Sequence, residues 1–325
     1  MSSDSWRLCD RKVTSGVAQG FGFPFRNRRF ASFTGDKRRV RLGGLDSCSL
    51  PAARREFFLW GLAIGASLLC WKVAAQASDE GISVTEILCD SMDESRSQAS
   101  LVEHLKDYGR IECPRVERAL LAVDRQHFLQ RSLPKCIVYQ DMPLPIGYGE
   151  TISAPHMHAT CLDILRHYLF RGARVLDVGS GSGYLSACMG LMVGQEGSIL
   201  GVEKHPELAR KSISNIRKSN PELLEGENPV VTIVAGNVLS GMLDEWGLFD
   251  AIHVGAAAKS LPEVLVNKLK PGGRMIIPVG PRDVYQELIC VDKDPDGAVY
   301  TETLMSVRYV PLTEPQEGTV RSNNN

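Results

Sequence analysis

RVLDVGSGSG, residues 174–183, joins a short apolar run to three glycines at alternate positions. The apolar run has the length and composition of a buried parallel strand, and a helical pattern follows over 185–193. Strand, glycine-rich turn and helix form the opening unit of a nucleotide-binding α/β domain, because glycine has no Cβ and lets a ligand approach the backbone. The alternative interpretation is an ordinary tight turn between a strand and a helix.

The spacing of these glycines distinguishes two kinds of nucleotide site. A dinucleotide site requires G-x-G-x-x-G, and Tyr184 stands where the third glycine of that pattern would be. A G-x-G-x-G loop after an acidic residue, here Asp177, is typical of S-adenosylmethionine binding in class I methyltransferases. That ligand has no pyrophosphate, so the loop need not direct a helix N-terminus at a phosphate. We therefore predict a Rossmann-like α/β methyltransferase fold, with an NAD-dependent oxidoreductase as the alternative.

The bulk composition indicates a globular protein with a basic N-terminal segment. With 43% hydrophobic and 23% charged residues the chain has ordinary globular composition, and its net charge of -1 gives no reason to expect nucleic acid as a partner. Residues 1–56 carry 12 Lys and Arg against five Asp and Glu, so the remainder is mildly acidic. The nine cysteines include no C-x-x-C pair, which argues against a zinc site or a disulfide scaffold. We predict no metal.

The first 97 residues read as targeting and linking segments. Residues 1–56 lack helical or strand periodicity, and we expect a disordered or targeting region there. Residues 57–71 are uncharged and mostly apolar, and an A-x-A pattern follows at 75–77. This run is at the short end of the length needed to span a bilayer. Residues 57–77 are therefore a candidate signal or signal-anchor, a single membrane anchor or the tail of a transit peptide, with possible membrane contact through 57–75. The alternative is a buried helix. Residues 78–97 form a polar linker.

Two further regions follow the linker. Residues 98–172 are predicted to form a helical subdomain that includes a loop rich in Pro and Gly at 139–151, part of which should face the substrate. Residues 173–315 show the strand and helix alternation of a doubly wound core, and 316–325 should be frayed. A helical pattern begins near residue 100, and the stretch 152–158 leads into a helix that ends at about 168. The other predicted helices are 116–123, 185–193, 207–218, 239–246 and 261–269, and the predicted strands are 174–178, 198–203, 230–235, 251–254, 274–279 and 306–310, with a turn at 270–273.

Polar residues at the ends of two predicted strands suit a nucleoside. Glu203 ends the second strand, where an acidic residue accepts hydrogen bonds from ribose hydroxyls in folds of this type. A carboxylate suits a vicinal diol because it offers several lone pairs and no competing donor; a solvent-facing charge is the alternative. Asn237 follows the third strand and can accept a hydrogen bond from the adenine amine, less strongly than a carboxylate would.

Five motifs in order resemble one family. They are the glycine loop at 175–183, ISAPHMH at 152–158, FDAIHVGAAA at 249–258, LKPGGR at 269–274 and YVPLT at 309–313. Together they resemble protein-L-isoaspartate (D-aspartate) O-methyltransferases. The resemblance extends from about residue 100 to 313, some two thirds of the chain, and does not cover the first hundred residues.

The resemblance implies a protein repair reaction. S-adenosylmethionine would donate a methyl group to the α-carboxyl of L-isoaspartyl residues in damaged proteins, and more weakly to D-aspartyl residues. The ester would collapse to a succinimide that hydrolyses partly to normal aspartate. The implied partners are damaged proteins or peptides, and the implied state is a cytoplasmic monomer. Residues 1–77 could instead direct the chain to an organelle, the secretory route or a membrane. An isoaspartyl-binding adaptor with weak catalysis is the alternative.

The resemblance also assigns site residues by motif. Ser153 corresponds to the family's active-site serine. The positions expected to bind the cofactor are Thr151, Ile152, His158, Asp177, Gly179, Gly181, Glu203, Asn237, Val238 and Thr313. The family usually has Gly-Asp-Gly after the third strand, whereas this chain has Gly236-Asn237-Val238, so weaker cofactor binding is expected. The ribose acid is often Asp and here is Glu203, a milder departure.

The predicted chemistry needs few groups. A carboxylate is ionised at neutral pH and needs no general base to attack a methyl sulfonium. Alignment of the reacting atoms can supply about 7 to 11 kcal/mol of the barrier. Ser153 is therefore predicted to be a hydrogen-bond donor to the substrate carboxylate. The alternative for Ser153 is the N-cap of the helix that follows.

Overall fold

The computed structural model describes residues 96–281 and 284–312. The segments predicted as a basic region, 1–56, and as an apolar signal or anchor, 57–77, lie outside the described residues, as do most of the linker, Thr313 and the C-terminal tail. Within the described ranges, no helix is both long and apolar enough to cross a membrane.

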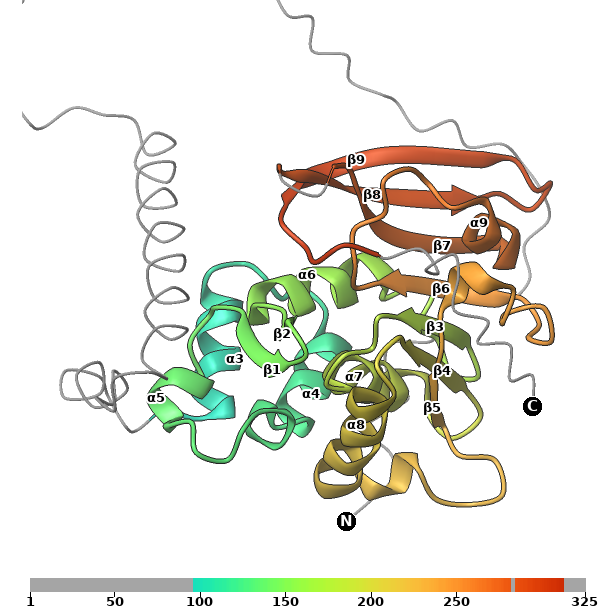
Figure 1. Ribbon diagram of the computed structural model, residues 1–325. Helices are drawn as coiled ribbons and strands as arrows, with labels where there is room; N and C mark the ends of the chain where they lie inside the picture. Colours follow the sequence, from blue (N-terminus) through green and yellow to red (C-terminus); the bar gives the residue numbers. More distant parts are fainter. Residues whose placement is uncertain (1–95, 282–283, 313–325) are drawn as a thin grey trace, which may run out of the picture. The chain divides into compact units, whose positions relative to one another are not determined.

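A seven-stranded sheet forms the centre of the domain, in the order β5-β4-β3-β6-β7-β8-β9 (Figure 1). Its strands are β3 (Arg174–Val178), β4 (Ser198–Glu203), β5 (Val231–Ala235), β6 (Phe249–Val254), β7 (Leu269–Val279), β8 (Gln286–Lys293) and β9 (Val299–Val307). Strands β3 to β7 are parallel, whereas β8 runs antiparallel to β7 and β9 antiparallel to β8. The chain moves outward from β3 through β4 to β5 and then returns to the other side of β3. In open α/β sheets the ligand crevice lies at the carboxyl ends of the strands, at such a switch point.

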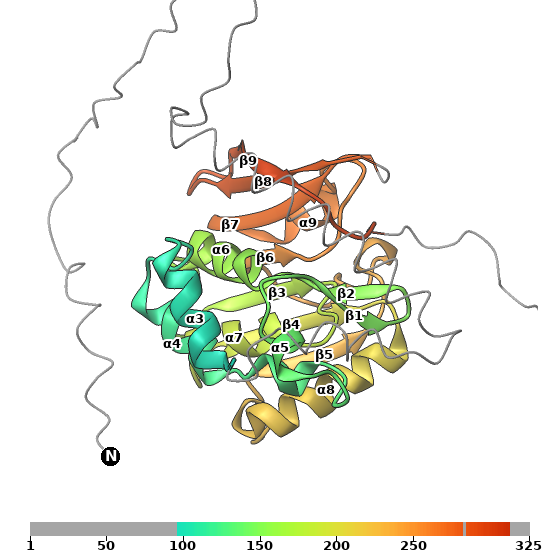
Figure 2. The same ribbon diagram turned by 90° about the vertical axis from the view of Figure 1, so that its left-hand side faces the viewer.

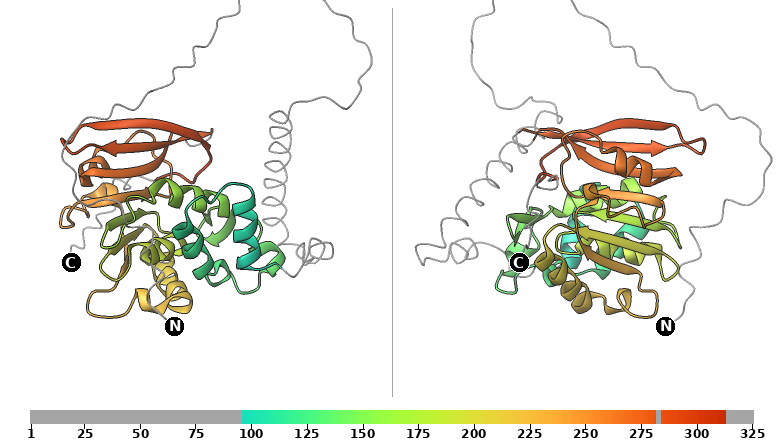
Figure 3. Two further views of the ribbon diagram at one scale, coloured as in Figure 1. Left: turned by 180° about the vertical axis from the view of Figure 1, so that it is seen from behind. Right: turned by 45° about the vertical axis from the view of Figure 1, so that its right-hand side comes forward.

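Apolar side chains on both faces give the sheet two cores. Val175 packs in a core with α7 (Tyr184–Val193) and α8 (Pro206–Ser219). Leu176, the next residue, belongs to a second core that includes Leu265 of α9 (Glu263–Lys268). Successive residues of a strand point to opposite faces, so each central strand contributes to both cores, and helices cover both sides of the sheet (Figure 3).

The N-terminal region forms α3 (Gln98–Asp107), α4 (Pro114–Ala122), the 3-10 turn η1 (Arg125–Phe128), α5 (Lys135–Val138) and α6 (Pro155–Leu165) on one side of the sheet, where α4 packs against α7 (Figure 2). Three of these, α3, α4 and α6, correspond to predicted helices, whereas η1 and α5 were not predicted. Their buried residues, among them Leu105 and Leu162, share the core of α7 and α8. The 3-10 turn η2 (Pro221–Leu223) closes the end of this core after α8. The helical region thus stands beside the glycine loop rather than apart from it.

Residues 139–151 are not the continuous loop that the sequence predicted. They contain the antiparallel strand β1 (Leu144–Gly147), which pairs with β2 (Glu150–Ile152). Leu144 and Ile146 point inward and are almost fully buried, a strand alternation that the Pro and Gly content had obscured. Gly147, Tyr148 and Gly149 all have positive φ at the tip, so a tight reversal replaces the expected loop.

Two other predictions, both for residues that follow β5 in the chain, were wrong. The helix expected over 239–246 is only the 3-10 turn η3 (Val238–Ser240), because Gly241 follows in the left-handed region with φ of 79° and ends it. The predicted turn at 270–273 lies inside β7, which pairs with β6 around an irregularity in register.

The last strands also differ from expectation. β8 was not predicted, and the final strand is β9 (Val299–Val307) rather than 306–310. Eight of the nine residues of β9 are at least partly exposed on an edge of the sheet, so the strand has no apolar alternation to signal it. Residues 308–310 instead leave the sheet and run toward the site.

Candidate active site

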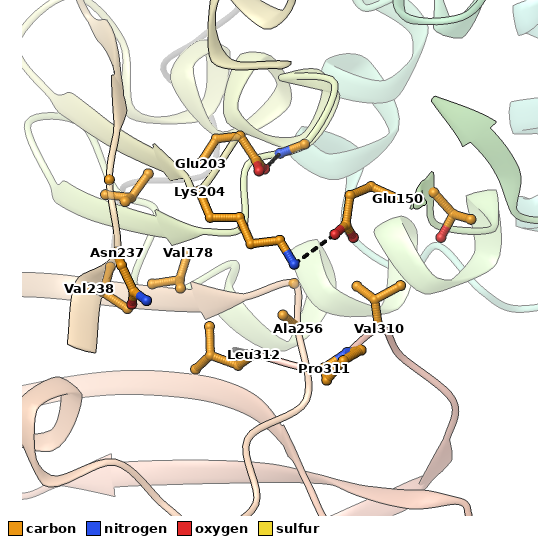
Figure 4. Close-up of a pocket in the computed structure, with 16 residues that line it drawn as sticks. Glu150, Val178, Glu203, Lys204, Asn237, Val238, Ala256, Val310, Pro311 and Leu312 are labelled. Carbon is orange, nitrogen blue, oxygen red and sulfur yellow. Dashed lines mark hydrogen bonds and ion pairs between the residues drawn. The ribbon is translucent and has the colours of Figure 1, made fainter. Parts of the chain in front are cut away.

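A pocket lies at the carboxyl ends of the parallel strands, where the strand order predicts a ligand crevice (Figure 4). Six predicted site residues line it: Thr151, Gly179, Gly181, Glu203, Asn237 and Val238. In Figure 4, Asn237 and Val238 lie at one end of the pocket and Glu150 at the other. The arrangement matches the prediction of a nucleoside site, with the adenine candidate at one end and the motif of Ser153 at the other.

The glycine loop brings bare backbone to this pocket. Gly179 and Gly181 have φ values of 71° and 53°, in the left-handed region that side chains disfavour. The N–H of Gly179 donates to the carbonyl of Val202 at 2.8 Å, which fixes the loop to β4. A Cβ added at Gly181 would lie 3.3 Å from Cδ1 of Ile146 in the β1–β2 hairpin. The loop is therefore confined between β4 and the hairpin, and no Cβ of Gly179 or Gly181 stands in the pocket.

Glu203 is held ready as an acceptor. Its side chain is 3% exposed, and its two oxygens accept from the backbone N–H of Gly181 and of His205, each at 3.0 Å. Burial raises the pKa of Glu203 above its ordinary value, and the two N–H bonds oppose this shift without cancelling it. Each carboxylate oxygen has a second lone pair, so the group can still accept from two ribose hydroxyls in a fixed orientation.

Asn237 and Val238 form the opposite end of the pocket. The Oδ1 atom of Asn237 accepts from the N–H of Leu239 at 2.9 Å and so caps the short turn η3. Val238 is 1% exposed and lines the pocket. The amide oxygen is thus oriented by its own chain, at the place where the sequence predicted an adenine contact.

Asp177 does not line the pocket. It is 1% exposed, and its Oδ1 lies 2.8 Å from Nδ1 of His253 on the neighbouring strand β6. Its Oδ2 accepts from the hydroxyl of Ser186 in α7. The carboxylate therefore ties β3, β6 and α7 together beneath the glycine loop, and supports the loop rather than facing a ligand.

Of three other predicted residues, two stand apart from the lining and one lies outside the described residues. Ile152 is 3% exposed and packs in the core. The ring of His158 lies 4.9 Å from that of Tyr184. Burial, followed by the positive charge of Arg125, holds the pKa of His158 well below its ordinary value, so this imidazole is neutral near pH 7. The third residue, Thr313, is outside the described part of the chain.

Ser153 is not the N-cap of α6. Ala154 occupies that position, and its side chain makes no cap hydrogen bond. The carboxylate of Asp141 instead accepts from the N–H of His156 at 2.8 Å, which satisfies the first turn from outside the helix. The side chain of Ser153 lies near that of Tyr309, and Val310, the residue after Tyr309, lines the pocket. Ser153 is therefore free of helix capping and lies next to the segment that closes the site.

The sequence analysis missed two groups of lining residues. Glu150 and Lys204 meet across the pocket, with Oε1 to Nζ at 2.8 Å, and Nε2 of His205 lies 3.4 Å from the same carboxylate (Figure 4). Residues 310–312 pair with Ala257 through two backbone hydrogen bonds of 2.7 Å. The place of Lys204, directly after the predicted ribose acid, could have indicated its role. Nothing local signals Glu150, because its partner comes from another element.

In the described part of the chain, no group of three or more His, Cys, Asp or Glu residues could hold a metal ion. The polar groups that line the pocket offer hydrogen bonds and electrostatic interactions, and Thr151 of the lining lies two residues before Ser153. That set fits S-adenosylmethionine: an acid for the ribose, bare backbone at the loop, and a capped amide where adenine is expected.

Comparison with known proteins bears on the same residues. The family model described as protein-L-isoaspartate(D-aspartate) O-methyltransferase (PCMT) matches residues 96–317. The chain is 48% identical over 216 residues to protein-L-isoaspartate O-methyltransferase 1 of Arabidopsis thaliana, which covers 66% of this chain and 90% of the relative. A Caenorhabditis elegans protein-L-isoaspartate O-methyltransferase is 42% identical and is covered over 94% of its length, with 68% of this chain.

A solved structure agrees with the fold. It is a β-aspartate methyltransferase (PCMT) from Plasmodium falciparum in complex with S-adenosyl-L-homocysteine, and it is 38% identical with a TM-score of 0.61. The alignment covers 67% of this chain and 99% of that one. The prediction of a Rossmann-like class I methyltransferase fold is confirmed. With the five motifs, the pocket and the match over residues 96–317, the chain belongs to the protein-L-isoaspartate(D-aspartate) O-methyltransferase family.

Proposed function

We propose that this enzyme transfers a methyl group from S-adenosylmethionine to the α-carboxyl of L-isoaspartyl residues, and more weakly of D-aspartyl residues, and that Ser153 orients the accepting carboxylate. The observation that carries the proposal is the pocket itself. Glu203 lines it and is held by two backbone donors, and Thr151 of the lining stands two residues before Ser153. The site thus offers groups that can bind a nucleoside beside the hydroxyl of Ser153.

The residues of the chain have a limited set of tasks in this reaction. The cofactor supplies an electrophilic methyl group on a sulfonium. Glu203 accepts from the ribose, the glycine loop leaves room for the ligand, and Asn237 faces the adenine. The isoaspartyl carboxylate is ionised at neutral pH, so no residue has to remove a proton. Ser153 donates a hydrogen bond to one carboxylate oxygen and leaves the other to attack, which is a contribution of orientation.

Of the two alternative functions considered from the sequence, one is excluded and the other needs an activity measurement. Family membership excludes the NAD-dependent oxidoreductase, in agreement with Tyr184 in place of a third glycine. The isoaspartyl-binding adaptor differs from the enzyme only in turnover, and Asn237-Val238 is the feature that favours it. An activity measurement decides between them.

The remaining expectations concern the cellular setting. We propose a monomer that acts on damaged proteins and peptides, with Ile152, His158, Asp177 and Thr313 contributing to cofactor binding directly or through the elements they support. We also propose that residues 1–77 target or tether the enzyme and take no part in catalysis. The basic composition of 1–56 and the uncharged run at 57–71 support this role.

The test is methyl transfer by the full-length chain from labelled S-adenosylmethionine to an isoaspartyl peptide, beside the same peptide with normal aspartate. Labelling of the isoaspartyl peptide alone supports the proposal. Binding of cofactor and peptide without turnover would favour the adaptor. For Ser153, the variant Ser153→Ala should lower kcat and leave the affinity for S-adenosylhomocysteine unchanged; unchanged turnover would exclude its role.

A further inference from the structure

Two adjacent apolar side chains are exposed in the loop between β7 and β8. The structure describes residues 280, 281, 284 and 285 of this loop. Val284 is 55% exposed and Tyr285 is 60% exposed, and we call these two residues the rim pair. Exposed apolar side chains are ordinary on protein surfaces when they occur singly, so the location of the rim pair decides whether it has a role.

The rim pair lies at the edge of the sheet that holds the active site. β7 is parallel to β6, and the pocket lies at the carboxyl ends of the parallel strands. Because β8 runs antiparallel to β7, it begins at that same edge, where Glu287 is the register partner of Val279. Tyr285 comes two residues before Glu287. The loop that carries the rim pair therefore belongs to the same edge as the pocket.

Backbone hydrogen bonds tie the start of this loop to the pocket lining. The N–H of Gly280 donates to the carbonyl of Ala258 at 2.9 Å, and the N–H of Ala258 donates to the carbonyl of Pro278 at 2.9 Å. Ala258 comes two residues after Ala256, which lines the pocket. The loop thus starts beside a segment that forms part of the wall of the site.

The side chain of Gln286 fixes the other end of the loop. Gln286 is 1% exposed. Its Nε2 donates to the carbonyl of Pro281 at 2.9 Å and to the carbonyl of Val284 at 3.0 Å. Its Oε1 accepts from the N–H of Tyr309 at 2.9 Å. One buried amide therefore holds the loop in shape and also joins it to the segment that leads into the site.

These bonds keep the rim pair close to the methyl-acceptor end of the pocket. Val310, the residue after Tyr309, lines the pocket and lies in Figure 4 on the same side as Glu150, away from Asn237. Standard bond lengths and the hydrogen bond of Gln286 limit the separation of the Cα atoms of Tyr285 and Val310 to at most about 16 Å. An extended peptide covers about 3.3 to 3.6 Å per residue, so about three to five residues reach that far.

We propose that the rim pair binds an apolar side chain of the substrate polypeptide, about three to five residues from the isoaspartyl residue. This inference rests on the proposed function, which places the isoaspartyl residue at the methyl-acceptor end of the pocket. The substrate chain continues on both sides of that residue and must leave the pocket across its rim. The exposed loop beside Val310 is continuous with the site, so the substrate is the partner that reaches it.

The chemistry of the rim pair suits such a contact. An aliphatic and an aromatic side chain gain free energy when a further apolar group removes their surface from water. A tyrosine ring offers a large area with few torsions to immobilise. Because Gln286 already holds the loop through the carbonyls of Pro281 and Val284, binding does not have to order the backbone of these residues, which lowers the entropic cost of association.

The chain offers a matched control at the far end of the same strands. Val299 and Tyr300 repeat the two residue types at the start of β9 and are 41% and 60% exposed. Tyr300 is the register partner of Asp292, six residues after Gln286 in β8. Six residues of strand span about 20 Å. Substitutions at Val299 and Tyr300 therefore remove the same side chains from a place remote from the pocket.

The test measures peptide affinity of the full-length protein by isothermal titration with saturating S-adenosylhomocysteine. The reference is an isoaspartyl peptide whose other residues are serine, and each test peptide has one leucine three, four or five positions before or after the isoaspartyl residue. For the wild type, at least one leucine peptide should bind about three- to tenfold more tightly than the reference. The double variant Val284→Ser/Tyr285→Ser should lose this gain and keep its affinity for S-adenosylhomocysteine. Val299→Ser/Tyr300→Ser should retain the gain.

Three outcomes would overturn the inference. They are equal affinity of the wild type for all the peptides, a leucine gain that persists in Val284→Ser/Tyr285→Ser, and a gain that Val299→Ser/Tyr300→Ser loses as well. Sedimentation velocity examines the other possible occupant: a wild type that self-associates only when the rim pair is intact would make the pair a contact between copies of the chain. Titration needs no turnover, so failure of the proposed methyl transfer is recorded separately from failure of this inference.

Discussion

The two halves of the site are built in different ways. The cofactor half consists of the glycine loop and the ends of β4 and β5, and its key contacts, such as Gly181 to Glu203 and Leu239 to Asn237, are backbone hydrogen bonds to side chains at strand ends. The acceptor half gathers Ser153, the β1–β2 hairpin and residues 308–312 from distant parts of the chain. The first half is specified locally, whereas the second depends on tertiary packing. Changes to the first should therefore act on cofactor affinity, and changes to the second on turnover or stability.

The largest effect that this contrast predicts is on the cofactor half. Glu203→Ala removes the acceptor for the ribose and leaves two backbone donors, of Gly181 and His205, without their partner. Hydrogen bonds to a charged group contribute about 1.5 to 3 kcal/mol each, so affinity for S-adenosylhomocysteine should fall about 100-fold or more. Isothermal titration measures it.

The matched control for Glu203→Ala is Glu207→Ala. Glu207 is an exposed acid of α8 that pairs with Arg210, and its removal should leave the affinity unchanged. If Glu203→Ala kept wild-type affinity and lost only kcat, Glu203 would belong to the acceptor half, and the division of the site would be wrong.

The next effect concerns the stability of the acceptor half. Asp141→Ala removes the carboxylate that satisfies the first turn of α6 through His156. Loss of a cap of this kind costs about 1 to 2 kcal/mol, so the urea midpoint should fall at pH 7. Affinity for S-adenosylhomocysteine should stay unchanged, because Asp141 is not part of the cofactor half.

The difference in stability between wild type and Asp141→Ala should decrease as the pH falls. Burial raises the pKa of Asp141, but the hydrogen bonds and charge of His156 outweigh it and bring the pKa below its ordinary value. A carboxyl whose pKa is depressed on folding contributes stability that is fully present above its unfolded pKa of about 3.9 and is lost as pH falls through the folded value. The gap between wild type and Asp141→Ala should therefore close in acid. A gap of constant size from pH 7 to 3 would mean that the charge is not responsible.

The same contrast explains which parts could be predicted from the sequence. The glycine loop and Glu203 were predicted because each lies beside a buried strand whose apolar pattern places it. The partners of Asp177 and Ser153 were not, since His253 is 76 residues from Asp177 and meets it only through the register of β3 and β6. Family motifs named Ser153, but its neighbours needed the fold.

The hydrophobic pattern of the sequence also gave wrong predictions for elements whose burial or backbone geometry is atypical. β9 is exposed on the sheet edge and so has no apolar period to detect. The region after β5 has apolar spacing suited to a helix, yet Gly241 adopts φ of 79° and stops it after three residues. In the hairpin, Pro145 and the glycines at the tip masked the inward Leu144 and Ile146. Elements with a clear apolar period were predicted, whereas the exposed edge strand and the short irregular elements were not.

One substitution in the cofactor half, at Asn237, is expected to raise the affinity for the cofactor instead of lowering it. Asn237→Asp keeps the cap on the N–H of Leu239 and replaces an amide oxygen by a charged acceptor for the adenine amine. Charged acceptors exceed neutral ones by about 1 kcal/mol per bond, so affinity for S-adenosylhomocysteine should rise about fivefold, with kcat at saturation unchanged. Asn220→Asp, in the buried turn after α8, is a control for the substitution itself and should give no gain. Weaker binding by Asn237→Asp would show that the adenine is not recognised through this side chain.

The smallest effect is expected where the two halves touch. Glu150 belongs to the hairpin and Lys204 to the end of β4, and their 2.8 Å ion pair spans the pocket, with Tyr148 stacked on His205 beside it. Partly exposed pairs contribute about 0.2 to 1 kcal/mol, so Glu150→Gln should speed release of S-adenosylhomocysteine by about two- to threefold. Stopped-flow chase measures that rate. Salt should speed release from the wild type and not from the variant, whereas Glu196→Gln, which breaks the 2.6 Å surface pair with Arg171, should match the wild type. If the hairpin instead moves freely over the cofactor half, Glu150→Gln and Glu196→Gln will release S-adenosylhomocysteine at the same rate. The Glu150–Lys204 ion pair, the only one between described lining residues, would then not couple the two halves of the site.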